Sequence, residues 1–503
     1  MRGLLLGGAA LVGLAMPAGA ETLRDALAKA YASNPTLTGQ RAALRATDET
    51  VPIARASGLP GLAAQGSVTD NILQANNNFL NPERSGNGAL NLSVPLFQGG
   101  AVKNAVRAAE TRVDAGRATL RGTEASTFTN VVAAYMNVIR DEAITSLNQQ
   151  NVRVLEVNLQ ASKDRFQVGD LTRTDVAQSE ARLALARAQL QQAEAQLISS
   201  RETYIAVVGT PPVALEQPPA LPKLPASPNE AVSEALNLNP NLIAARRQAD
   251  ATRYDIGVAR ASRLPKLSAV TGGTYFTYLG SLPPASVVQG VPNSGTAATA
   301  GLQFSLPLFQ GGRPAAQVRQ AEAQRGQALE AVTATERNVI AQTRSAYAVW
   351  QSSQQVIASS ETAVNANKLS LEGVRAENSV GTRTVLEILN AEQELLNSQV
   401  TLVSARRDAY VAGFALLAAM GHAEARDLGL DGGALYDPVL NYKRVRGRIN
   451  DFGGDGEPEP VATTTAQTPA QTATVTRTFD PMLDTPVDRS PALTTGASSP
   501  DRR

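Results

Sequence analysis

His422 is the only histidine of this 503-residue chain, and the chain has no cysteine. These two residue types supply most zinc ligands, many nucleophiles and the commonest general base. The sequence therefore cannot build a Cys/His zinc cluster, a cysteine nucleophile or a Ser/His/Asp triad unless everything depends on His422. That residue lies in AAMGHAEA, a predicted helix end, where a solvated histidine is ordinary. The P-loop pattern GxxxxGK[ST] is also missing. The composition favours a protein that is not an enzyme and needs no cofactor or metal.

The other candidates are polar side chains beside two turns, each of which contains a Val-Gly pair followed by Thr-Arg-Thr. Thr172 with Asp175, and Thr384 with Glu387, fit the Ser/Thr-x-x-Asp/Glu pattern in which two side chains cap the start of a helix. By itself, this pattern predicts that a helix begins directly after each turn.

Long helices must position these turns. Residues 96–210 and 315–437 contain no proline, and both segments are rich in Ala, Gln, Glu, Arg and Leu, which favour helix. The stretch 101–168 alone would form a helix about 100 Å long, at roughly 1.5 Å per residue. No ordinary globular domain is that long. The turns at Gly169 and Gly381 divide each segment in two, which predicts two long helical hairpins.

The helix after each turn shows a seven-residue hydrophobic period, which is the spacing of a coiled coil. The period consists of Val176, Leu183, Leu190, Leu197 and Tyr204 in the first segment and of Leu389, Leu396, Val403, Tyr410 and Leu417 in the second. In the first segment, small residues lie between the large ones, so that neighbouring helices can approach closely. A plain antiparallel coiled-coil hairpin would satisfy the same period.

The two hairpins belong to an internal duplication. VPLFQGG, at 94–100, returns as LPLFQGG, at 306–312, and the offset of 212 (312 − 100) also brings Tyr135 onto Tyr347. In each phrase the proline is predicted to end a strand, and the two glycines allow a sharp change from strand to long helix. The predicted strand-to-helix junctions are Pro95, Gly99 and Gly100 in the first copy and Pro307, Gly311 and Gly312 in the second.

An alternating apolar and polar pattern precedes each junction, in LNLSVPLF at 90–97 and in GLQFSLPLF at 301–309. A barrel strand between lipid and water gives this pattern, and so does a half-buried strand of a soluble sheet. Each copy has room for two such strands, and a barrel that spans a bilayer needs at least about eight. The four strands of one chain must therefore close with those of other chains, because lipid cannot satisfy open sheet edges. Two chains would give eight strands and three chains would give twelve, and the pattern leaves both numbers open.

The remaining segments differ from the two copies in composition. Residues 1–20 have an Arg, a short apolar run and a final Ala-Gly-Ala, which predicts a secretory signal cleaved after Ala20. Removal of Arg2 would bring the formal charge from +1 to zero, which argues against a nucleic-acid partner. Residues 453–503 are rich in Pro and Thr and poor in large apolar residues, which predicts a disordered tail.

These motifs together resemble those of the TolC-type outer-membrane channel proteins. The resemblance rests on the signal peptide, the doubled PLFQGG, RFQVGDLTRTDV at 165–176, SVGTRTVLEILNAEQEL at 379–395 and an Asn-Pro pair in the first helix of each copy. It implies a mainly α protein with a small β-barrel part. Specifically, it implies a homotrimer whose twelve-stranded outer-membrane barrel continues as a long coiled-coil helical tunnel across the periplasm.

The resemblance also implies a function and partners. The implied function is that of a passive exit duct in the outer membrane, which conducts drugs, small molecules or secreted proteins. The implied partners are a periplasmic adaptor (membrane-fusion) protein, an inner-membrane RND or ABC transporter and outer-membrane lipid. A periplasmic coiled-coil adaptor or scaffold without a pore is the alternative.

The predicted division of the chain is a signal peptide (1–20), a first repeat (21–209), a Pro-rich linker (210–228), a second repeat (229–437), a C-terminal periplasmic extension (438–452) and the tail (453–503).

Roles at the closed end of the implied tunnel follow from the same resemblance. Thr174 and Asp175 resemble residues that tie neighbouring helices together at the periplasmic entrance, and Arg383 resembles their basic partner. Glu387 and Asn390 resemble the acidic ring of the constriction. Helix capping is the other role open to these side chains, and the two roles can coexist.

Two residues depart from the family pattern. Asn390 stands where the best-known members carry Asp, and Asn378 stands where they carry Tyr, so the ring should be less acidic here. The residues of the helix turns that the implied adaptor would contact are Val168, Gly169, Val380 and Gly381.

Overall fold

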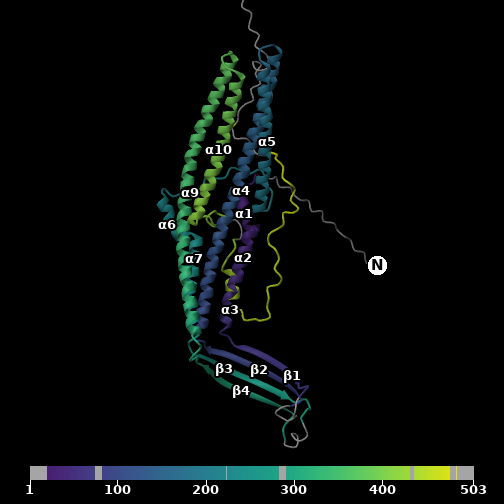
Figure 1. Ribbon diagram of the computed structural model, residues 1–503, viewed down its shortest axis with the longest axis vertical. Coiled ribbons are helices and arrows are strands. Elements are labelled where there is room, and N and C mark those ends of the chain that lie inside the picture. The colour runs from purple at the N-terminus through teal and green to yellow at the C-terminus, as the bar shows by residue number, and fades with distance from the viewer. Residues whose placement is uncertain are drawn as a thin grey trace, which may run out of the picture.

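The computed structural model describes residues 20–73, 82–222, 224–282, 290–430, 435–475 and Leu483. Long helices run the length of the molecule and end in a small sheet (Figure 1). The predicted signal peptide lies, except for Ala20, outside the described residues and stays a prediction. In the part of the chain that the structure describes, no helix combines the length and the apolar content needed to cross a membrane.

The order of the elements repeats once along the chain, and the two copies match in length. The first copy consists of α1 (Leu23–Ser33), α2 (Pro35–Asp48), α3 (Thr50–Ala56), β1 (Gly61–Asp70), β2 (Arg84–Phe97), α4 (Ala101–Gln167) and α5 (Arg173–Val208). The second consists of α6 (Pro228–Leu238), α7 (Pro240–Ala261), β3 (Lys266–Thr277), β4 (Ser294–Ser305), α9 (Arg313–Ser379) and α10 (Val385–Met420), and α11 (Leu440–Val445) follows. Helices α4 and α9 have 67 residues each, and α5 and α10 have 36 each. The predicted duplication and the two long helical hairpins are confirmed.

The four strands form one antiparallel sheet in the order β1-β2-β3-β4. The outer strands, β1 and β4, each pair on one side only within the described chain. The sequence thus predicts correctly that the chain is mainly helical with four strands. The central pair, β2 and β3, joins the two copies of the duplication, because β2 belongs to the first and β3 to the second.

The repeated phrase does not end both strands in the same way. In the first copy the strand passes through Pro95 to Phe97, with a bulge between them against β3, so the prediction that Pro95 ends a strand is wrong. In the second copy the strand ends at Ser305, before Pro307. The difference follows from pairing: Lys266, at the start of β3, lies opposite Ser305, so no residue of β3 remains to pair beyond it.

Two glycines make the predicted change from strand to helix in each copy. Gly99 and Gly100 have φ of 62° and 80°, and Gly311 and Gly312 have φ of 59° and 80°. These values lie in the left-handed region, which residues with a Cβ rarely adopt. The sharp turn into α4 and into α9 therefore depends on both glycines of each pair.

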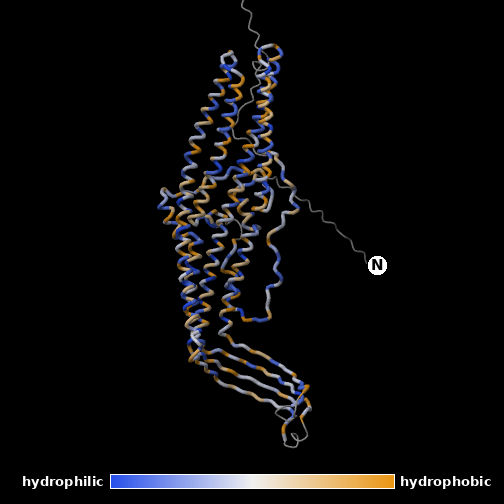
Figure 2. Tube along the Cα trace, in the orientation of Figure 1, coloured by the Kyte–Doolittle hydropathy of each residue, from blue (hydrophilic) through white to orange (hydrophobic). Residues whose placement is uncertain are grey.

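Helices α4 and α9 run in the same general direction, with α7 and α10 between them (Figure 1). Next to the turns the order across the layer is α9, α10, α4, α5, and next to the sheet it is α9, α7, α4, α2. Hydrophilic and hydrophobic positions alternate along all the long helices (Figure 2). The short helices thus stack end to end, α5 on α2 and α10 on α7, to match the length of α4 and α9.

An Asn-Pro pair lies at each place where two short helices meet end to end. Asn34 accepts hydrogen bonds from two backbone N–H groups of α2, and its Nδ2 donates to the carbonyl of Val207 at the end of α5 (2.8 Å). Asn239 makes the same contacts between α7 and the Ala419 carbonyl of α10 (2.8 Å). One amide therefore satisfies backbone groups of two helix ends, and proline can follow because its missing N–H would have no helical partner.

The two aligned tyrosines have equivalent roles. The Tyr135 hydroxyl lies 2.9 Å from the carbonyl of Glu21 and 2.7 Å from that of Glu216, and the Tyr347 hydroxyl donates to the Ala226 carbonyl (2.9 Å). Each tyrosine fastens the irregular chain near the first helix of a copy, α1 or α6, to a long helix. These irregular segments, which include the linker between α5 and α6, cover one face of the helix layer together with α1.

The described part of the predicted tail, 453–475 and Leu483, contacts the helices, which its composition did not predict. The backbone N–H of Gln471 donates to Glu202 of α5 (3.1 Å), and Leu483 is buried. The composition does not predict these contacts, because backbone groups and single apolar side chains make them. The predicted disorder of residues 476–482 and 484–503 concerns a part of the chain outside the described residues and stays a prediction.

Candidate gate and duct surface

A pair of hydrogen-bonded side chains caps the helix after each turn. Thr172 donates through both its backbone N–H (2.9 Å) and its hydroxyl (2.7 Å) to Oδ2 of Asp175, and these bonds hold the pKa of Asp175 below its usual value. Thr384 makes the same contacts with Glu387, at 2.8 and 3.0 Å. Both predicted helix caps are therefore present, at the starts of α5 and α10.

Arg383 binds two carboxylates of its own hairpin. Its Nε donates to Glu377 and its Nη1 donates to Glu387, both at 2.6 Å. Hydrogen bonds from the Thr384 backbone, the Arg383 guanidinium and the Thr384 hydroxyl lower the pKa of Glu387 to about 2. Among the described residues of this single chain, Arg383 makes no hydrogen bond or ion pair with Thr174 or Asp175. The implied tie between the helices is therefore not formed within one chain.

A hydrogen bond between the hairpins near the turns involves a residue that the sequence did not single out. Arg182 of α5 donates through Nη2 to Oδ1 of Asn390 on α10 (2.7 Å). Within the single chain, Asn390 accepts a hydrogen bond from a cation of the other hairpin. Its place in the constriction stays a prediction.

A buried carboxylate forms a second link between the hairpins. Glu392 of α10 is 6% exposed, and both of its oxygens accept hydrogen bonds from Asn158 of α4 (3.0 and 2.9 Å). Arg375 of α9 donates to the same carboxylate at 3.0 Å. Burial raises the pKa of Glu392, and the charge of Arg375 and the hydrogen bonds oppose that rise. The seven-residue period offered a signal for this site, because Glu392 lies three residues after Leu389, at a seam position.

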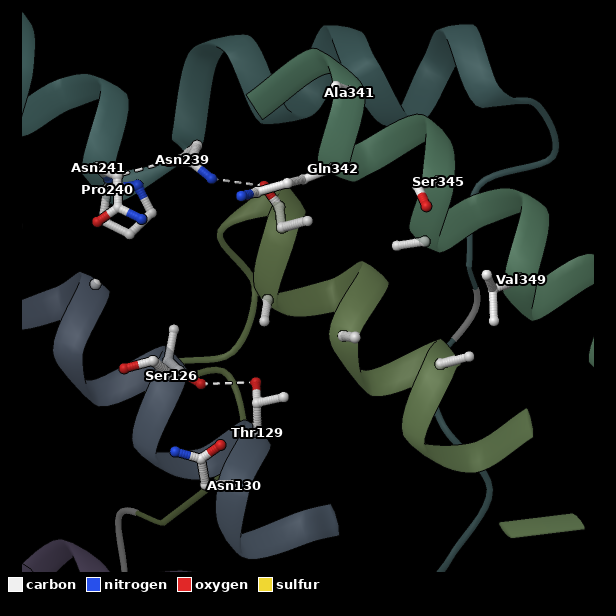
Figure 3. A pocket seen from close by; sticks show the side chains of 17 residues that line it. Ser126, Thr129, Asn130, Asn239, Pro240, Asn241, Ala341, Gln342, Ser345 and Val349 are labelled. Carbon is white, nitrogen blue, oxygen red and sulfur yellow. Dashed lines mark hydrogen bonds between the residues drawn. The ribbon is translucent and has the colours of Figure 1, made fainter. Parts of the chain in front are cut away.

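Two grooves lie on the face of the helix layer that α1 and the linker leave bare. One, of about 670 Å³, lies between α4, α5 and α10, and the other, of about 720 Å³, lies where α10 meets α7 (Figure 3). Amide, hydroxyl, alanine and larger aliphatic side chains line the two grooves, and Asp141 is the one charged residue among the described residues that line these two. The polar residues of the second groove include Ser126, Thr129, Asn130, Gln342 and Ser345.

The two faces of the layer differ because of helical geometry. Asn397 and Thr401 line the first groove, whereas Gln399 lies between them in sequence and contacts the C-terminal segment. Residues two apart on a helix point about 200° apart, so these side chains are on opposite faces. One face is therefore bare at these grooves, and the other is covered by chain segments.

Hydrophobic side chains are exposed at the turns themselves. Val168 is 72% exposed and Val380 is 74% exposed, and each lies next to a turn glycine, Gly169 or Gly381, with φ of 81° or 84°. Thr174, one residue before Asp175, is also exposed. The two turns thus present matching apolar tips at the end of the molecule opposite the sheet (Figure 1).

Comparison with known proteins gives consistent results along the chain. A family model described as outer membrane efflux protein matches residues 26–210 and 231–422. The outer membrane efflux protein BepC of Brucella suis is 35% identical over 443 residues, which cover 88% of this chain and 94% of that protein. The outer membrane protein TolC of Escherichia coli is 28% identical over 489 residues, which cover 93% and 97%. The solved outer membrane protein VceC of Vibrio cholerae has the same fold, with a TM-score of 0.66 at 23% identity over 79% of this chain and 96% of that one. The chain therefore belongs to the outer membrane efflux protein family.

Proposed function

We propose that three copies of this chain form an exit duct, through which substrates delivered by an inner-membrane RND or ABC transporter and a periplasmic adaptor leave the cell. The chain acts at the outer membrane and extends into the periplasm, as an efflux or secretion channel. The duct conducts passively, and the adaptor and the transporter select the substrate.

Open edges carry the proposal for assembly. Strands β1 and β4 each lack a neighbour on one side within the described chain, and lipid cannot satisfy such an edge. Helix α9 also exposes apolar side chains, including Leu329 and Leu369, whereas α4 has neighbours on both sides. Other copies must cover both the strand edge and the helix edge. Three copies give the twelve strands that the family resemblance implies.

The bare polar face supports the proposal for conduction. The face covered by α1 and the linker is filled with chain, so the opposite face is the one that can line a lumen. Its alanine, amide and hydroxyl side chains can be hydrated without binding one class of substrate tightly. Such a wall suits a duct that passes substrates of different charge.

We propose that the turns are both the gate and the adaptor contact. Arg182 with Asn390, and Glu392 with Asn158, hold the two hairpins of one chain together. Thr174, Asp175, Arg383 and Glu387 are exposed or partly exposed at the same end, where a neighbouring copy can reach them. The apolar tips at Val168, Gly169, Val380 and Gly381 offer a surface to the adaptor.

Purified protein in planar bilayers tests the proposed function. We expect discrete conductance steps from an oligomer extracted in detergent, because a closed barrel with a hydrated lumen admits ions. A control preparation unfolded before addition should give no steps. A folded oligomer without conductance would favour the alternative, a periplasmic scaffold without a pore, and would refute the duct.

A further inference from the structure

The C-terminal segment returns to the covered face of the helix layer after α11. Arg201 of α5 donates to the backbone carbonyls of both Thr472 and Thr474. The same guanidinium forms an ion pair with Glu142 of α4, in which the two side chains are only 8% and 4% exposed. Ala473 and Val475 of the same segment pack against the cluster formed by α1, α4 and α5. A buried cation that binds two carbonyls of one extended stretch indicates specific recognition of that stretch.

A second contact lies closer to the turns and on other helices. Leu483 is 2% exposed and packs among side chains of three helices, including Leu147 of α4, Leu371 of α9 and Leu395 of α10. Its carbonyl accepts a hydrogen bond from Nε2 of Gln399 (2.8 Å), which is itself 3% exposed. A single leucine therefore fills the place where the two hairpins meet.

The two contacts of the C-terminal segment involve both helical hairpins. Arg201 belongs to the α4/α5 hairpin, and Gln399 belongs to the α9/α10 hairpin, so the segment bridges both. The contacts are made by a few backbone groups and by Ala473, Val475 and Leu483, with no helix or strand among the described residues 446–475. Because these contacts are few, those of another chain can replace them without unfolding either hairpin.

We propose that residues 471–475 and Leu483 are an intramolecular ligand of the covered face, in which 471–475 bind α4 and α5 and Leu483 enters the groove between the two hairpins. The groove lies on the covered face, outside the proposed lumen, and in the half of the molecule next to the turns. The site binds an aliphatic anchor at the position of Leu483 and backbone carbonyls at Arg201. A partner helix that docks between the hairpins has to displace this segment first. That last statement rests on the proposed function, whereas the groove and its ligand do not.

Binding of a peptide tests the groove directly. The probe is a labelled synthetic peptide of residues 469–486, added to detergent-solubilised protein that either keeps or lacks residues 453–503. We expect saturable binding to the truncated protein and at least tenfold weaker binding to the full chain, whose groove is occupied. The matched control peptide carries Leu483→Asp and should bind at least tenfold more weakly. Equal binding of the two peptides, or equal binding to the two proteins, would overturn the proposal.

Thiol labelling tests the same contact in the full chain, which has no natural cysteine. We expect Leu483→Cys to react with a maleimide at least tenfold more slowly than Thr463→Cys, because Leu483 is buried and Thr463 is exposed. Excess unlabelled peptide 469–486 should raise the rate at Cys-substituted position 483 by releasing the segment. Equal rates at the two positions would contradict burial, and a rate unaffected by peptide would contradict exchange. Bilayer conductance is measured separately, so failure of this inference and failure of the duct are distinguishable.

Discussion

Replacement of Glu392 by alanine should loosen the contact between the two hairpins more than any other single change near the turns. The substitution leaves the Arg375 guanidinium and the Asn158 amide without their shared carboxylate at a site that is almost fully buried. Removal of one member of a buried, hydrogen-bonded ion pair costs about 3–5 kcal/mol. We expect faster proteolysis in α10 and α9 near the turns and a larger open-channel fraction in bilayers.

Glu394→Ala is the matched control for this prediction. Glu394 lies two residues further along α10 and is exposed, so its loss should change stability by no more than about 0.5 kcal/mol. Proteolysis rates and open fractions should therefore remain those of the unaltered protein. If Glu392→Ala and Glu394→Ala behave alike, the buried carboxylate does not hold the hairpins together.

The second large effect should come from Arg182 and Asn390. Arg182→Ala removes a charge-assisted hydrogen bond that joins α5 to α10 near the turns. This bond is exposed to solvent, where such charged contacts contribute about 0.2–1 kcal/mol. We expect a rise of about two- to fivefold in the open population, measured from single-channel recordings.

A double-mutant cycle decides whether the effect belongs to this contact. Asn390→Ala should act like Arg182→Ala, and the double substitution should add little, because the two side chains belong to one interaction. Arg187→Ala is the control, since Arg187 pairs with Glu156 inside one hairpin. Additive effects of Arg182→Ala and Asn390→Ala would show that the two side chains act independently and would remove this contact from the gate.

The sequence predicted the features that depend on local patterns. Helix caps at Thr172 and Thr384, the glycine junctions and the duplicated hairpins all follow from residues close together in the chain. The Asn-Pro pairs were visible as a motif, but their role at Asn34 and Asn239 depends on a helix end about 175 residues away. Local patterns cannot indicate which distant carbonyl such an amide meets.

The candidate site was predicted less completely than the fold. Arg182 and Asn390 are 208 positions apart, and nothing in either stretch indicates that the two side chains meet. Glu392 could have been found, because a carboxylate at a seam position of a coiled coil needs a partner. The contacts at Thr472 and Thr474 could not, since they are made by backbone carbonyls, which every residue carries. The roles of Thr174, Asp175 and Arg383 between copies stay predictions.

The internal duplication also predicts how the sheet of one chain pairs with the sheet of the next chain. Adding 212 to a residue number maps β2 onto β4, and adding 205 maps β1 onto β3. With these offsets the β1–β2 register agrees with the β3–β4 register, because the pair Gly61 and Ser93 becomes the pair Lys266 and Ser305. Within the chain, Leu90 of β2 lies opposite Gly273 of β3. The equivalent pair between copies is Leu302 of β4 (90 + 212) and Val68 of β1 (273 − 205). Both side chains are exposed in the single chain, at 71% and 79%.

Disulfide cross-linking of Leu302→Cys with Val68→Cys therefore tests the closure of the barrel between copies most directly. Residues opposite each other in an antiparallel pair have Cα atoms about 4.5–5.5 Å apart, which a disulfide can bridge. We expect oxidation to link chains into species of up to three copies and no more. Leu302→Cys with Ser67→Cys should give little product, because Ser67 points to the other face of β1. Cross-linked species of two copies alone, or no cross-linking in an oligomer that conducts, would contradict the proposed trimeric barrel.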